Sequence, residues 1–118
     1  METQQAQLKT RTKQFAIRLV KLFRSLPKTE EARVIGKQVL RSGTSVAANY
    51  RAVWRARSKA EFIAKIGLVV EEADETVFWL ELLVETSIVQ QNLMDSLLHE
   101  ANELLAIFAA SQRTAKRN

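Results

Sequence analysis

The sequence predicts an all-α protein, an antiparallel up-down-up-down four-helix bundle in which residues 1–118 form one domain. Three glycines and one proline in 118 residues are too few for the frequent turns that a protein of many short strands needs. Apolar residues instead recur at helical spacing in four segments joined by short connections, which is typical of a bundle. A chain of this length is expected to bury one ordinary hydrophobic core.

The first two helices are predicted at about 5–26 and 29–56. Apolar side chains of the first gather on one side of a helical wheel, with the basic residues outside it. Pro27 ends this helix because proline lacks the N–H that the helix requires. Thr29 has the chemistry of an N-cap for the second helix, and the two glutamates that follow suit the positive end of its dipole.

The third and fourth helices are predicted at about 58–86 and 90–112. Ser58, followed three residues later by Glu61, has the spacing of a capping box just ahead of a long apolar periodicity. The last residues, 113–118, are expected to form a frayed basic tail.

The stretch RSGTS in the second predicted helix leaves two interpretations open. Gly43 could end one helix, with Thr44 or Ser45 capping the next. The apolar face, however, keeps its phase through this point, and both Gly36 and Gly43 lie on it. A continuous helix is therefore favoured, in which the glycines allow a neighbouring helix to approach closely, as Gly67 would on the third helix.

The charge is distributed very unevenly along the chain. Residues 1–59 hold 14 Lys and Arg against three acids, a net charge of +11, whereas residues 60–118 carry a net charge of −6. Five cations fall on one stripe of the second helix with no acid between them, and two more follow. We call these seven residues the basic stripe: Arg33, Lys37, Arg41, Arg51, Arg55, Arg57 and Lys59. The stripe is explained by solvation, by pairing with the acidic third helix, or by a bound polyanion.

The third helix is apolar on a second side, where hydrophobic residues alternate with glutamates. Such a face, if exposed, usually marks an interface, so we expect self-association in which arginines of a neighbouring subunit pair with the glutamates. The predicted oligomer interface comprises Leu68, Glu71, Glu72, Glu75, Phe78, Trp79 and Leu82.

Catalytic chemistry finds little support in the sequence. There is no cysteine, no G-x-S-x-G turn and no glycine-rich phosphate loop. Bundles that hold a dinuclear metal site carry a Glu-x-x-His pattern, but the residue three positions before the single histidine, His99, is Ser96. Asp95 and His99 have i,i+4 spacing, which fits an ordinary side-chain pair on a helix better than a metal site. We interpret Trp54 and Trp79 as core or interface anchors in preference to surfaces on which nucleic-acid bases stack. We expect no enzymatic activity, no cofactor and no metal.

The N-terminal residues lack the apolar segment of a signal peptide, and no apolar run is long enough to cross a bilayer. Without cysteine, a reducing compartment is the simplest setting. We therefore expect a cytoplasmic protein with no membrane association.

The string RSGTSVAANYRAVWRARSKAEFIAKIGLVVEEADETVFWLELL resembles the bacterial four-helix-bundle proteins related to the 23S rRNA intervening-sequence protein, a group that includes the accessory variability determinant proteins of diversity-generating retroelements. The resemblance implies a ring-like homopentamer without enzymatic activity. In the retroelement members it implies a basic surface that binds nucleic acid and a reverse transcriptase. The sequence departs from many relatives in lacking a Glu-Gly pair after the asparagine, here Asn49.

Two hypotheses follow. In the first, the protein is a non-enzymatic oligomer that binds RNA or DNA through the basic stripe, with steep dependence on salt and little sequence specificity. In the second, it is an interaction scaffold whose arginines are satisfied in subunit interfaces and whose partner is a protein such as a reverse transcriptase.

Overall fold

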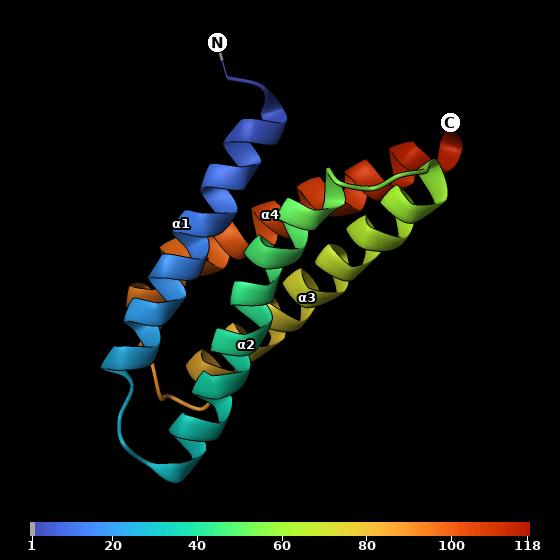
Figure 1. Ribbon diagram of the computed structural model, residues 1–118. Helices are drawn as coiled ribbons and strands as arrows, with labels where there is room; N and C mark the ends of the chain where they lie inside the picture. Colours follow the sequence, from blue (N-terminus) through green and yellow to red (C-terminus); the bar gives the residue numbers. More distant parts are fainter. Residues whose placement is uncertain (1) are drawn as a thin grey trace.

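The computed structural model describes residues 2–118, which form four α-helices: α1 (Gln4–Ser25), α2 (Glu30–Val53), α3 (Lys59–Glu85) and α4 (Gln91–Arg117). Helix α2 packs between α1 and α3, α3 packs on α4, and α4 returns to α1 over the least extensive of the four contacts (Figure 1). The predicted all-α class with four helices is confirmed, and the packing agrees with a bundle. The longest dimension, 46 Å, is close to the roughly 40 Å of a 27-residue helix, so α3 and α4 run most of its length.

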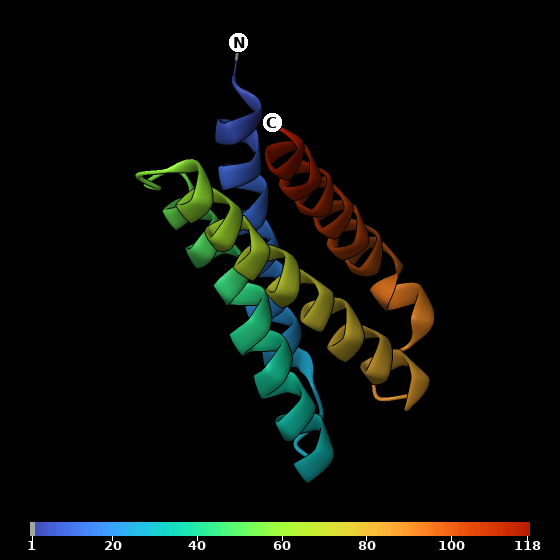
Figure 2. The same ribbon diagram turned by 90° about the vertical axis from the view of Figure 1, so that its right-hand side faces the viewer.

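The two termini lie at the same end of the bundle, as both views show (Figures 1 and 2). The turn between α2 and α3 lies at this end too, whereas the other two connections lie at the opposite end. The residues that follow α2 are therefore grouped with the beginning of α1 and the end of α4.

Both predicted N-caps are present. The Thr29 hydroxyl accepts a hydrogen bond from the Ala32 N–H at 3.3 Å, and the Ser58 hydroxyl accepts one from the Glu61 N–H at 3.0 Å. Each bond satisfies one of the backbone donors that the first turn of a helix leaves without an intrahelical partner. Thr3 caps α1 in the same way, which the sequence did not lead us to expect.

Helix α2 ends at Val53, three residues before the predicted end. The reason lies in the following cap, because Ser58 has to be extended, with φ −156° and ψ 163°, to reach the first turn of α3. The chain leaves the helical path through a tight turn in which the Arg55 N–H donates to the Ala52 carbonyl. Arg55 and Arg57 therefore lie in the α2–α3 turn and not on a helix.

Helix α4 continues to Arg117, so most of the segment 113–118 that we expected to form a tail is helical. Thr114 and Ala115 line a hollow together with Gln4 and Phe62, which places the last turns of α4 beside the beginnings of α1 and α3. Neighbouring helices at this end give residues near the C-terminus a surface to pack on.

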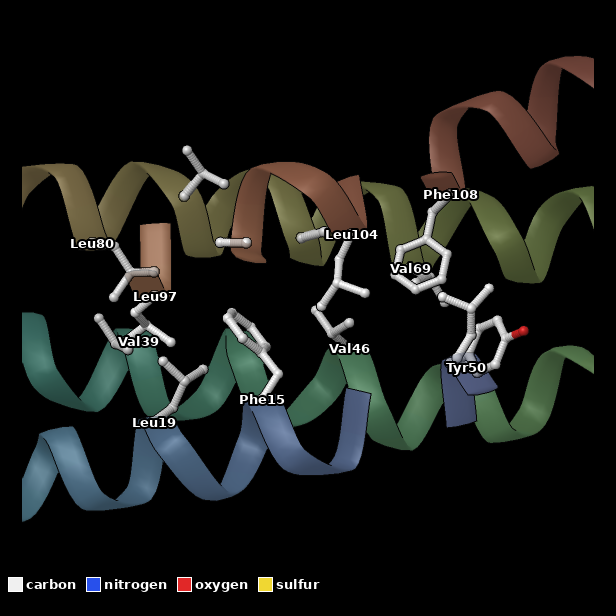
Figure 3. Close-up of a cluster of buried hydrophobic side chains, with 14 of the residues drawn as sticks. Phe15, Leu19, Val39, Val46, Tyr50, Val69, Leu80, Leu97, Leu104 and Phe108 are labelled. Carbon is white, nitrogen blue, oxygen red and sulfur yellow. The ribbon is translucent and has the colours of Figure 1, made fainter. Parts of the chain in front are cut away.

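The core runs along the bundle axis and draws on all four helices (Figure 3). Each of its large apolar side chains contributes roughly 1.5–3 kcal/mol when it leaves water. The largest fully buried side chains are Tyr50, Phe108, Leu19, Ile66, Leu80, Leu83, Met94 and Leu104.

Helix α2 is continuous through Gly43, so the interpretation of a break at this residue is wrong. A Cβ atom at Gly36 would lie 2.6 Å from Leu26 Cδ1, and one at Gly43 would overlap Leu19. Both glycines thus bring α1 close to α2, as predicted. A Cβ at Gly67 would lie 2.9 Å from Nε2 of Gln112 in α4.

The first serine of the RSGTS stretch, Ser42, packs against α3, the other neighbour of α2. The Ser42 hydroxyl lies 2.9 Å from the Thr76 hydroxyl of α3, and both side chains are fully buried. The same two hydroxyls lie within hydrogen-bond distance of the Gln38 and Glu72 carbonyls of their own helices. The small residues of this stretch therefore serve packing on both sides of α2.

Candidate nucleic-acid interface

A groove runs along the surface between α1 and α2. It consists of two adjoining hollows that share Lys9 of α1 and Arg51 of α2. We call it the basic groove, because four of its lining residues are cations and none is an acid. Its lining residues are Gln5, Lys9, Lys13, Thr44, Ala47, Ala48, Tyr50, Arg51, Trp54 and Arg55.

Small side chains keep the groove open between its cations. Ala47 and Ala48 lie between the positions of Thr44 and Arg51 on α2. The Thr44 hydroxyl donates to the Leu40 carbonyl at 2.6 Å, which folds this side chain back onto its own helix. On α1, Lys9 and Lys13 are one helical turn apart and therefore project from the same side of the helix.

In the described part of the chain, the cations of the basic groove lack a protein counter-charge. Across residues 2–118, no acidic side chain lies within ion-pair distance of Lys9, Lys13, Arg51 or Arg55. Like charges held close together repel, and an anion placed among them relieves that repulsion. The arrangement can therefore bind phosphate, to which arginine offers planar bidentate contacts and lysine a point charge.

Arg11, a neighbour of these lysines on α1, has the opposite environment. Its guanidinium donates to Glu100 at 2.7 Å and to Glu103 at 2.8 Å, both on α4. The hydrogen bond with Glu100 is the main cause that raises the pKa of Arg11, and burial partly offsets it. Near Arg11 the two edges of α1 thus differ, since the cation toward α4 is neutralised and the lysines toward α2 are not.

The basic stripe predicted from the sequence is not a single surface. Arg41 turns toward α3, where its guanidinium pairs with Glu75 and lies 3.4 Å from Glu72. Arg33 lines a separate small hollow beside the α1–α2 connection, and Lys37 lies exposed between it and Arg41. Only two members of the stripe, Arg51 and Arg55, enter the basic groove.

The remaining two members follow α2. Arg57 lies in the α2–α3 turn with its side chain 90% exposed, and its Nε is 3.9 Å from a carboxylate oxygen of Glu61. Lys59 is the exposed first residue of α3. Both belong to the end of the bundle that carries Arg55 and could extend a basic surface from the groove.

The face of α3 predicted as an oligomer interface is partly exposed, with Leu68 at 52% and Phe78 at 53%. Two of its glutamates, Glu72 and Glu75, pair with Arg41 of the same chain and therefore do not need a counter-charge from a second subunit. Glu75 also accepts a hydrogen bond from the Trp79 indole N–H at 2.9 Å. Glu71 is exposed, and Trp79 and Leu82 are half-buried against the core.

An aromatic cluster closes the groove at the end that holds the termini. Trp54 packs edge-to-face against Tyr50, with ring centroids 6.3 Å apart, and against Phe62 at 5.5 Å. The Tyr50 hydroxyl is buried, points away from the other labelled core side chains (Figure 3), and has no hydrogen-bond partner within residues 2–118. Burial raises the pKa of Tyr50, and the indole N–H of the neighbouring Trp54, which does not reach hydrogen-bond geometry with the hydroxyl, lowers it by less.

Asp95 and His99 do not pair with each other. Asp95 accepts a hydrogen bond from Gln91, and His99 Nε2 lies 3.3 Å from a Glu103 oxygen. The described part of the chain has no group of three or more His, Asp or Glu side chains placed to hold a metal ion. Nor does any helix between residues 2 and 118 combine the length and apolar character needed to cross a membrane.

Sequence reasoning missed the α1 side of the groove. Lys9 and Lys13 are spaced like other exposed lysines, and the α2 residues that line the same hollow are more than 30 positions away in the chain. The sequence offered no signal for them, because the contrast between Arg11, which has a partner on α4, and its two basic neighbours becomes visible only when the positions of both neighbouring helices are known.

Comparison with known proteins places these features in a family context. The model of a family described as 23S rRNA-intervening sequence protein matches residues 4–110. A crystal structure of a protein of unknown function from the S23 ribosomal protein family of Bacteroides thetaiotaomicron superposes with a TM-score of 0.86 at 33% sequence identity. The match covers 94% of this chain and 99% of that one. A comparison with curated proteins found no match.

Proposed function

The chain belongs to the 23S rRNA-intervening sequence protein family, and we propose that it is a non-enzymatic protein that binds the phosphate backbone of RNA or DNA through the basic groove. One observation carries the proposal: Lys9, Lys13, Arg51 and Arg55 line an acid-free groove and have no ion-pair partner in the described chain. Four uncompensated cations on α1, on α2 and in the turn that follows α2 suit a polyanion better than a single small anion.

Binding of this kind depends on released counterions. Each phosphate that a lysine or arginine neutralises frees condensed salt ions, so the logarithm of affinity falls linearly with the logarithm of salt concentration. Contacts to phosphate fix the position of the ligand but carry no sequence information. The groove is therefore expected to discriminate little between sequences. Self-association through the α3 face, up to the pentamer that the resemblance implies, would repeat the groove and raise avidity.

The test is fluorescence-anisotropy binding to a labelled duplex DNA, a structured RNA and an RNA–DNA hybrid, each over a salt titration. Arg51→Glu is expected to lower affinity at least about tenfold and to reduce the salt slope by about one unit or more. Lys21→Glu is the matched control, because Lys21 is exposed on α1 but does not line the groove. This control carries the same change of charge and should bind almost as the unmodified protein does.

Two results would contradict the proposal. One is the absence of binding to all three ligands at a salt concentration of about 50 mM, where phosphate contacts are strong. The other is equal loss of affinity in Arg51→Glu and Lys21→Glu, which would mean that net charge and not the groove controls the interaction.

A second candidate function is favoured by the exposed face of α3. Leu68 and Phe78 are each more than half exposed, although both are large and apolar. In this alternative the protein is an interaction scaffold that self-associates through α3 and serves a protein partner such as a reverse transcriptase. Phe78→Glu should then reduce the molar mass measured by light scattering without loss of helix content, and an unchanged mass would contradict it.

A further inference from the structure

We propose that Trp54 and the cations beside it form a subsite for an unpaired nucleotide, whose base stacks on the indole ring while the adjoining phosphates meet Lys9, Arg51 and Arg55. This inference rests on the proposed function and deepens it, because it names the ligand as single-stranded nucleic acid or an unpaired loop. It also gives an exposed aromatic residue a role that packing alone does not supply.

The first support is the exposure of Trp54. Its side chain is 48% exposed, in a protein whose only tyrosine is 2% exposed one helical turn earlier. A large apolar ring left in water forgoes much of the stabilisation that burial gives. The ring is nonetheless held in place, since Tyr50 and Phe62 pack edge-to-face against it.

The second support is the backbone around Trp54. The residue is the C-cap of α2, and its N–H donates to the Ala52 carbonyl. The next two N–H groups, of Arg55 and Ala56, donate to the Ala52 and Val53 carbonyls at 3.0 and 3.2 Å. This turn fixes Trp54 and Arg55 relative to α2, so a base that stacks on Trp54 meets an ordered surface.

The third support is charge. Trp54 lines the same hollow as Lys9, Arg51 and Arg55, and no acid lines that hollow. Base–aromatic stacking beside cations that follow the phosphate backbone is the usual way in which proteins bind single strands. A base within a duplex is already stacked on both faces and cannot use the indole. The subsite therefore selects nucleotides that are free of pairing.

The same charge argues against a two-fold symmetric contact with a second copy of the chain on this surface. In a two-fold symmetric contact a patch meets itself, so these three cations would face the same three cations of the partner. Like charges brought together in this way cost affinity. A polyanion on this surface creates no such repulsion.

The experiment uses the intrinsic fluorescence of the two tryptophans, Trp54 and Trp79. In Trp79→Phe the only indole is at position 54, and in Trp54→Phe it is at position 79. Each variant is titrated with a single-stranded oligothymidylate of about 20 nucleotides and with a duplex of equal length. We expect the single strand to quench emission strongly in Trp79→Phe and little in Trp54→Phe, and the duplex to quench neither.

Affinity provides a second readout. Trp54→Ala should bind the single strand roughly 5- to 100-fold more weakly, the range that loss of one stacked base produces, and should bind the duplex within about twofold of the unmodified protein. Should Trp79→Phe fail to fold, the unmodified protein is compared with Trp54→Phe. Quenching by the single strand that is present in the first and absent in the second gives the same information.

Each unfavourable outcome has one meaning. Single-strand binding without a change in Trp54 emission, or with equal affinity in Trp54→Ala, overturns the subsite and leaves the groove proposal standing. A dependence of Trp54 emission on protein concentration in the absence of nucleic acid would place this surface between copies of the chain, and also overturns the subsite. Failure to bind either ligand overturns the proposed function itself.

Discussion

Gly43 of α2 faces the fully buried Leu19 of α1 so closely that a Cβ atom at position 43 would overlap the leucine side chain. The close approach explains why a poor helix former stands in the middle of a long helix. Alanine is intrinsically better than glycine by about 1 kcal/mol in a helix, but here the gain is opposed by steric overlap. The sign of the Gly43→Ala effect therefore reports which of the two dominates.

We expect Gly43→Ala to lower the free energy of unfolding by about 1–3 kcal/mol, because Leu19 is enclosed on all sides and cannot move without displacing the core. Urea unfolding followed by circular dichroism measures this change. Gly67→Ala is the matched control. Its new Cβ would meet only the amide end of Gln112, a flexible and half-buried side chain, so this variant should gain up to about 1 kcal/mol. Destabilisation of similar size in both variants would contradict the argument.

Ser87 is the only residue other than glycine with a positive φ, 63°, in the part of the chain that the structure describes. It occupies the αL position that follows α3, where its N–H donates to the Val84 carbonyl and the Ile88 N–H donates to the Leu83 carbonyl. Glycine adopts this conformation without the steric cost that a Cβ imposes. Ser87→Gly should therefore raise the thermal unfolding temperature, in line with a gain of about 1 kcal/mol. Ser111→Gly, inside α4, should lower it, and a lower temperature for both would rule out the αL explanation.

The Tyr50 hydroxyl is buried without a partner among residues 2–118, so its removal should not weaken the fold. Tyr50→Phe is expected to raise the free energy of unfolding by about 1 kcal/mol at neutral pH, because the cost of burying an unpaired hydroxyl disappears. A loss of more than about 1 kcal/mol would show instead that the hydroxyl has a partner such as ordered water.

The same substitution predicts a dependence on pH. Burial raises the pKa of Tyr50 in the folded state above its usual value of 10.0, so the unfolded chain loses this proton first. Stability is therefore unaffected below pH 10 and falls as the pH rises through the folded-state pKa. The advantage of Tyr50→Phe should widen above pH 10 in urea titrations, and absorbance of the phenolate of the single tyrosine monitors the ionisation directly. A constant advantage across this range would contradict the prediction.

Arg41 belongs to the predicted stripe but pairs with Glu72 and Glu75, so it should behave differently from Arg51. We expect Arg41→Ala to cost up to about 1 kcal/mol of stability, since the pair is partly exposed. Its effect on polynucleotide affinity should stay within about twofold, whereas Arg51→Ala should weaken binding and leave stability unchanged. Parallel urea unfolding and anisotropy experiments separate the two roles, and a loss of affinity in Arg41→Ala equal to that in Arg51→Ala would count against the division.

The fold followed from the sequence because its signals are local. Thr29 and Ser58 cap helices through atoms within three residues, and the phase of apolar residues carries α2 through Gly43. The ends of helices were harder to place. Val53 ends α2 because of the geometry that Ser58 requires, which a helical wheel does not contain.

The candidate site was only partly predictable for a related reason. A wheel of α2 shows which cations share a side of the helix, but not which neighbouring helix lies beside each one. Arg41 and Arg51 lie at opposite margins of the same acid-free stripe on the wheel. In the structure the first pairs with acids of α3, whereas the second lines a hollow with Lys9 and Lys13 of α1. Distances between helices decide which charges remain uncompensated, and these distances arise only from tertiary packing.

The limited contact between α1 and α4, which includes the ion pairs of Arg11, affects how readily α1 opens locally. With its other edge held by α2 alone, α1 is less firmly held than α3, which packs between α2 and α4, so its amide protons should exchange with deuterium sooner than those of α3. One wall of the basic groove is thus less firmly anchored than the other, because α2 packs on both α1 and α3. A strand bound across Lys9 and Arg51 would tie α1 to α2, so part of its binding energy would appear as slower exchange in α1.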